Sequence, residues 1–68
     1  MAIENEIRRL RFEHGEMTQA QLAERIGMTR QTVIAIEQNK YAPSLEAAFR
    51  IAHAFGAPLE SVFRWKAD

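Results

Sequence analysis

The strongest restriction on the fold lies in residues 19–38, where small and apolar residues recur at helical spacing on both sides of Gly27. Glycine readily adopts the left-handed backbone conformation that stops a helix abruptly. A small residue at Ala23 lets two helices approach near a right angle, and Val33 and Ile36 are placed to hold the second helix against the first. The spacing therefore predicts two short helices joined by a tight turn, packed through Leu22, Ala23, Ile26, Met28, Val33 and Ile36.

Capping residues predict where the helices begin and end. Thr18 and Gln21 match a capping box, and Thr29 and Ser44 are suited to cap the helices that follow them. No alternation of period two extends over five or more residues, so no strand is expected. The sequence predicts an all-α fold of five helices, at about Asn5–His14, 19–26, Arg30–Gln38, 45–55 and a short one that starts at Pro58.

Apolar periodicity predicts which side chains form the core. Ile7 and Leu10 point inward from the first helix, and Ile3 can extend that stripe, whereas Phe12 lies on the opposite side. Phe12 is therefore either an exposed aromatic or a contact for another element. Residues 64–68 are expected to form a short tail. The last two helices are expected to bury Leu45, Ala48, Phe49, Ile51, Ala52, Phe55, Leu59, Val62 and Phe63.

Composition and charge exclude several classes of protein. The 68 residues suffice for one domain, 1–68, and leave no room for a ligand-sensing domain after the motif. Because cysteine is absent, disulfide scaffolds and thiolate metal sites are excluded. The acidic N-terminus without an apolar run indicates a cytoplasmic protein. Nine lysines and arginines balance nine aspartates and glutamates, so any nucleic-acid contact depends on local clustering of cations.

Catalysis and cofactor binding have little support in the sequence. His14 and His53 lack the spacing of metal ligands, so no metal site is expected. Glu24 and Glu37 have no visible partner for acid–base chemistry, and no glycine-rich phosphate loop occurs. The sequence predicts neither an enzyme nor a metal or cofactor site.

Much of the chain resembles a known family of regulators. The resemblance is carried by Met17–Gly27, Thr29–Val33 and Ile36–Lys40, which are similar to the xenobiotic-response-element family of phage-repressor-like and Cro-like regulators. It implies a compact, five-helix, lambda-repressor-like DNA-binding domain with a helix-turn-helix motif at about 19–38. It also implies a sequence-specific transcriptional regulator, expected to be a repressor, whose second motif helix enters the major groove.

The same resemblance implies roles for individual residues. Arg30 and Gln31 are expected to contact base edges, since arginine pairs with guanine and glutamine with adenine in the major groove. Ala35 is short enough for close approach or for contact with a thymine methyl group. The residues expected to contact phosphates are Gln19, Arg11, Thr29, Thr32 and Lys40, and Gln19 can also brace a recognition side chain.

The sequence departs from the family pattern at two positions. Glu16 is one residue more than usual between the first two helices, which can shift the first helix and with it Arg11. Asn39 stands where glycine is frequent, and asparagine tolerates the left-handed conformation needed there.

The expected partner is double-stranded DNA with an inverted-repeat operator, bound by a homodimer. Phe63 and Trp65 are either a tail folded back on the core or a dimer contact. A second interpretation keeps the fold but makes the chain an antitoxin-like or partner-binding adaptor that uses the surface around Phe12 or Trp65.

Overall fold

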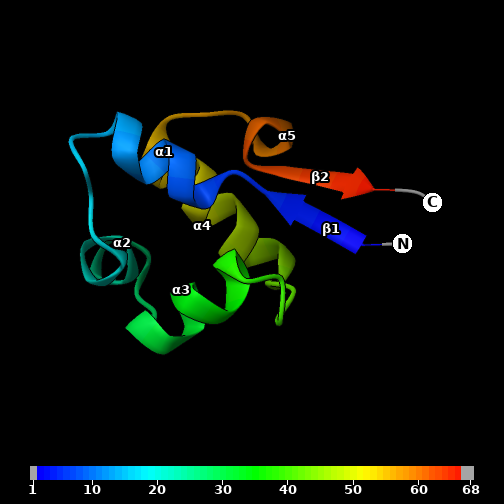
Figure 1. Cartoon of the computed structure of the whole chain (residues 1–68), viewed down its shortest axis with the longest axis horizontal. Coiled ribbons are helices and arrows are strands. Elements are labelled where there is room, and N and C mark those ends of the chain that lie inside the picture. The colour runs from blue at the N-terminus through cyan, green and yellow to red at the C-terminus, as the bar shows by residue number, and fades with distance from the viewer. Residues whose placement is uncertain (1, 67–68) are drawn as a thin grey trace.

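A computed structural model describes residues 2–66, which form five helices and two short strands (Figure 1). The predicted five-helix arrangement is confirmed, with boundaries that agree to within a few residues. Asn5 does not belong to the first helix as predicted, because its Oδ1 accepts a hydrogen bond from the Ile7 backbone N–H at 3.1 Å just before that helix. The elements in chain order are β1 (Ala2–Asn5), α1 (Ile7–Glu13), α2 (Gln19–Ile26), α3 (Arg30–Glu37), α4 (Leu45–Phe55), α5 (Leu59–Val62) and β2 (Phe63–Lys66).

The predicted caps begin three of these helices. The Thr18 hydroxyl accepts from the Gln21 backbone N–H at 3.0 Å, and the Gln21 side chain accepts from the Thr18 backbone N–H at 2.9 Å. This reciprocal pair satisfies two backbone donors that a helix start leaves without partners. Thr29 caps α3 and Ser44 caps α4 through one hydroxyl contact each. Gly27 ends α2 with φ of 72°, so the tight turn forms as the spacing predicted.

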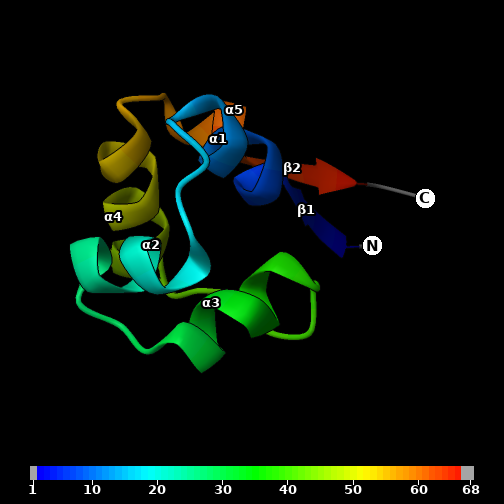
Figure 2. The ribbon, with the colours of Figure 1, turned by 60° about the vertical axis from the view of Figure 1, so that its left-hand side comes forward.

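The core lies where α1, α2, α3 and α4 meet, and Val62 of α5 closes it. Leu22, Ile26, Val33 and Ile36 are at most 2% exposed, which confirms their predicted burial. Their side chains pack α3 against the rest of the bundle, and Figure 2 shows α3 at the lower edge of the molecule, beneath α2. The packing therefore leaves one side of α3 open to solvent.

The prediction that Leu45 and Phe49 belong to the core is wrong. Phe49 is 54% exposed and Leu45 is 69% exposed. A helix turns by about 100° per residue, so Phe49 points roughly opposite to the fully buried Ile51. The apolar arc of α4 is wider than its buried face, which includes the small residues Ala47 and Ala48.

The expectation of no strand is also wrong, because the two ends of the described chain pair as an antiparallel two-stranded sheet. Ile3 lies opposite Trp65, and Asn5 lies opposite Phe63. Each strand has only four residues, which is too short for alternation to be recognised in the sequence. Ile3 is thus part of β1 rather than of the first helix, and the predicted tail forms β2 as far as Lys66, while its last two residues lie outside those described.

Candidate nucleic-acid interface

Helix α3 presents a polar face to solvent. Arg30 and Gln31 are exposed at its first turn, Ala35 is partly exposed one turn later, and Val33 on the inner side is 1% exposed. Because the inner side is fixed by the core, the outward direction of these three side chains is determined by the packing of α2 against α3. These are the three positions for which base contacts were predicted.

The N-terminal end of α3 is suited to an anion. The Thr29 hydroxyl lies 2.9 Å from that of Thr32 and accepts from the Thr32 backbone N–H at 3.2 Å. The backbone N–H groups of Arg30 and Gln31 have no partner within the helix, because a helix start leaves its first donors unpaired. These donors and the helix dipole favour a negatively charged group such as phosphate.

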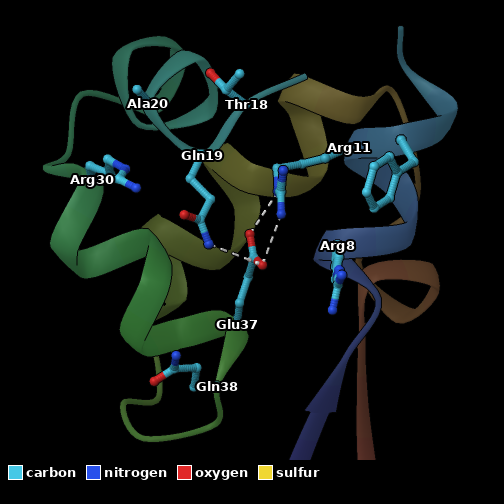
Figure 3. A pocket seen from close by; sticks show the side chains of 9 residues that line it. Arg8, Arg11, Thr18, Gln19, Ala20, Arg30, Glu37 and Gln38 are labelled. Atoms are coloured by element: carbon cyan, nitrogen blue, oxygen red, sulfur yellow. Dashed lines mark hydrogen bonds and ion pairs between the residues drawn. The ribbon is translucent and has the colours of Figure 1, made fainter. Parts of the chain in front are cut away.

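An open groove of about 550 Å³ lies between α1 and the two motif helices. Arg8 and Arg11 approach it from α1, Gln19 from α2, and Arg30 from α3 (Figure 3). Cations from two separate helices, α1 and α3, thus gather on one side of a protein whose formal net charge is zero. Local clustering supplies the positive surface that the overall charge does not.

A nearly buried ion pair crosses the inner end of this groove. The Arg11 Nε lies 2.7 Å from Oε2 of Glu37, and its Nη2 lies 3.1 Å from Oε1. Their side chains are only 11% and 8% exposed, and Arg11 Nη1 also donates to the Met17 carbonyl at 2.8 Å. Gln19 Nε2 approaches the same carboxylate at 3.4 Å. Glu37 therefore has a partner that sequence analysis did not find, and the Arg11 guanidinium is directed inward.

Arg8 is the residue that sequence analysis missed. It is exposed, forms no ion pair within residues 2–66, and its guanidinium carbon lies 5.9 Å from the centre of the Phe12 ring. Arg11 approaches the same ring at 5.9 Å, so Phe12 is a half-exposed platform for two cations. The spacing of Arg8, Arg11 and Phe12 places them on one side of a helix, and this signal was available in the sequence. Arg9, by contrast, is paired with two glutamates elsewhere on α1.

Lys40 lies at the opposite end of α3 from Arg30. Its backbone N–H donates to the Ala35 carbonyl at 2.9 Å, which closes the C-terminal end of the helix. The Lys40 side chain is exposed and makes no ion pair in the described part of the chain. The two cations thus lie at opposite ends of the exposed helix.

The two histidines serve no common site. The ring nitrogens of His14 lie 2.8 Å from the Leu10 carbonyl and 2.9 Å from the Phe55 carbonyl, so the ring joins the ends of α1 and α4. His53 is exposed on α4. Residues 2–66 hold no group of three side chains able to bind a metal ion, and no helix among them is long and apolar enough to span a bilayer.

Comparison with known proteins places this arrangement in a family. The sequence model of the helix-turn-helix family matches residues 7–62. An uncharacterized HTH-type transcriptional regulator from Methanocaldococcus jannaschii is 44% identical over 97% of this chain and 98% of its own. One from Methanothermobacter thermautotrophicus is 53% identical over 84% and 83% of the two chains.

A solved structure shows the same fold. The crystal structure of a Bacteroides fragilis protein, provisionally described as DNA-binding, superposes with a TM-score of 0.79. Its sequence is 24% identical, and the match covers 91% of this chain and 98% of that one. The family match extends over both motif helices and the core around them, and it confirms the resemblance seen in the sequence. The chain belongs to the helix-turn-helix family.

Proposed function

We propose that the chain is a homodimeric repressor that reads an inverted repeat in duplex DNA with α3 in the major groove. Its class, a DNA-binding transcriptional regulator, follows from the family match and from the regulators to which the chain is similar. The observation that carries the proposal is the exposure of Arg30 and Gln31 on a helix held from behind by α2. Repression would follow from occupation of the operator, in the cytoplasm.

Base recognition is assigned to the first two turns of α3. Arg30 presents a guanidinium that can donate two hydrogen bonds to guanine, and Gln31 can pair with adenine in the same two-bonded manner. Each correct pair contributes about 1–3 kcal/mol of discrimination between bases. Ala35 follows on the same face, where a short side chain lets the helix approach the base edges closely.

Phosphate contacts are assigned to groups around the edge of this face. Lys40 and Arg8 supply charge, whereas Gln19, Thr29 and Thr32 supply neutral donors near helix starts. Arg11 receives a different role from the one expected from the sequence. Because its guanidinium is paired with Glu37 and largely buried, we assign it to holding α1 and α3 in a fixed orientation.

The surface around Phe12, one of the two on which the adaptor interpretation depends, lies beside the groove lined by arginines. The exposed Phe12 ring contacts the guanidinium groups of Arg8 and Arg11 beside the groove, which accounts for its exposure without a protein partner.

The proposal is tested by selecting bound duplexes from a random pool, followed by titration of variants against the selected site and an unrelated duplex. Arg30→Ala is expected to lower discrimination by about 1–3 kcal/mol with little change on unrelated DNA. Lys40→Ala and Arg8→Ala should weaken both duplexes alike and reduce the salt slope by about 0.9 per phosphate contact.

Arg9→Ala is the matched control, because Arg9 lies beside Arg8 on α1 but is paired with Glu6 and Glu13. It should leave affinity and salt slope nearly unchanged. Affinity for duplex DNA that does not depend on salt, or an equal loss from Arg9→Ala and Arg8→Ala, would overturn the assigned roles.

A further inference from the structure

The sheet formed by β1 and β2 has two chemically different faces. Antiparallel partners share a face, so the register places Ile3, Asn5, Phe63 and Trp65 on one side of the ribbon. Glu4, Arg64 and Lys66 lie on the other side. This amphipathic ribbon projects from one end of the long axis of the molecule (Figure 1).

The charged face is complete within one chain. Arg64 Nη2 lies 2.8 Å from a Glu6 carboxylate oxygen and 3.6 Å from one of Glu4, and Lys66 Nζ lies 3.6 Å from Glu4. Every charged side chain on that side thus has an opposite charge nearby. The face needs no partner from outside.

The apolar face is incomplete. Together with the loop after α3 it borders a groove of about 260 Å³, lined mainly by Ile3, Ile36, Tyr41, Ala42, Pro43 and Phe63. Trp65, the strand partner of Ile3, is 63% exposed, Tyr41 is 53% exposed, and Ile3 is 39% exposed. A two-stranded sheet is at best marginally stable in water unless its apolar face is covered.

We propose that a second copy of this chain covers the apolar face, with Trp65 of each copy filling the groove of the other between the sheet and residues 41–43. The inference rests on the proposed function and identifies the surface through which the regulator dimerises. It also extends the predicted contact of Phe63 and Trp65 to Ile3 and to the loop after α3.

Charge distribution favours a second copy as the occupant. A two-fold interface brings each group near its own counterpart, so a charged side chain near the axis would meet a like charge. The groove lining holds no charged side chain, and its polar members, Asn5, Asn39 and Tyr41, are neutral. Depletion of charge with enrichment of aromatic residues is typical of the centre of protein interfaces. The same surface carries both the projecting indole and the hollow that can receive it.

The length of the molecule is consistent with a two-fold axis that passes beside the sheet. Two recognition helices in successive major grooves lie about 34 Å apart, so each must lie about 17 Å from the two-fold axis. The longest extent of the molecule is 33 Å, and the sheet lies at one end of it (Figure 1). If the two-fold axis passes that end, a distance of about 17 Å from the axis to each α3 fits within the 33 Å length of one molecule.

The groove is also joined to the recognition helix by direct hydrogen bonds. The Asn5 side-chain amide donates to the Ile36 carbonyl at 2.9 Å and to Asn39 Oδ1 at 2.9 Å. Asn39 has φ of 59°, the left-handed conformation predicted for it, and it is the second residue after the end of α3. Docking on this face therefore fixes the position of α3 relative to its counterpart.

The test compares the mass of the full chain by sedimentation equilibrium for the natural sequence, Trp65→Ala and Phe49→Ala. The natural chain should be a dimer, and Trp65→Ala should raise the dimer dissociation constant at least about 30-fold, as expected for a central tryptophan. Phe49→Ala is the control, because Phe49 is an exposed aromatic of similar accessibility on α4, outside the groove. Ile3→Lys, which places a charge on the apolar face, should give a monomer as well.

DNA titration separates this inference from the proposed function. Trp65→Ala should keep the affinity for a single half-site and lose the additional affinity for the inverted repeat. If neither the natural chain nor any variant binds a half-site, the proposed function is wrong. The sedimentation measurements then still show whether the chain dimerises through this surface. A natural chain that is monomeric, a Trp65→Ala chain that remains as dimeric as Phe49→Ala, or a natural chain that associates only with a different protein would overturn the inference.

Discussion

Removal of the Glu37 charge should destabilise this small protein severely. Glu37→Gln keeps the size of the side chain but leaves the Arg11 guanidinium, which is 11% exposed, without its counter-charge. Breaking a buried pair by removing one partner costs about 3–5 kcal/mol, because a charge stays away from water without compensation. Both side chains retain a little solvent contact, so we expect a loss of about 3 kcal/mol.

This loss is large on the scale of the whole chain. At about 0.05–0.15 kcal/mol per residue, a chain of 68 residues unfolds with a free energy of about 3–10 kcal/mol. A loss of about 3 kcal/mol corresponds to a fall in Tm of about 12–24 °C for a domain of this size. Urea unfolding followed by circular dichroism, with a thermal scan beside it, measures both quantities.

Two further variants decide whether burial is the cause. Replacement of both partners by apolar residues, Arg11→Met with Glu37→Leu, should recover much of the loss, because no unpaired charge then remains inside. Arg9→Gln removes a 53% exposed arginine that pairs with two glutamates and should cost far less, because water screens exposed ion pairs. If Glu37→Gln costs no more than Arg9→Gln, or if the double variant is less stable than either single one, the reasoning is refuted.

Three other predictions concern the stability of α1 and its ends. Glu16 has φ of 56°, which is unfavourable for a residue with a side chain, so Glu16→Gly should raise the free energy of unfolding by about 0.5–1 kcal/mol. A lower free energy of unfolding for this variant, measured with urea, would contradict the prediction. His14→Ala removes the ring that contacts carbonyl groups at the ends of α1 and α4 and should cost about 1–2 kcal/mol in the same assay, whereas a neutral change would exclude a structural role. A hydrogen bond from Arg9 lowers the pKa of Glu6, and the charge of Arg64 lowers it further. Desolvation acts in the opposite direction but does not cancel these effects. The stability that Glu6 contributes is thus present above the pKa of an unfolded glutamate and is lost as the pH falls through the lower folded value. Glu6→Gln and the natural chain should therefore differ in Tm near neutral pH and converge once the pH has fallen below the folded pKa of Glu6; a difference that persists in strong acid would show another origin.

Local sequence chemistry determined the helices, their caps and the exposed face of α3. Thr18, Thr29 and Ser44 accept hydrogen bonds from backbone N–H groups three residues further along the chain. Gly27 ends α2 because glycine readily adopts the positive φ that this position needs. Such interactions depend on neighbours in the chain, so they could be predicted without the fold. The outward direction of Arg30 and Gln31 followed in the same way, because the periodicity of Val33 and Ile36 fixes which side of α3 is buried.

Contacts between distant parts of the chain required the folded structure. The pairing of β1 with β2 joins the two ends of the chain, and neither four-residue strand carries a recognisable pattern alone. The Arg11–Glu37 pair and the exposure of Phe49 likewise depend on how whole helices pack, since the sequence shows which side chains are charged or apolar but not which of them meet. The groove beside Trp65 exists only because the sheet and the loop after α3 come together in space, and no local pattern encodes that meeting.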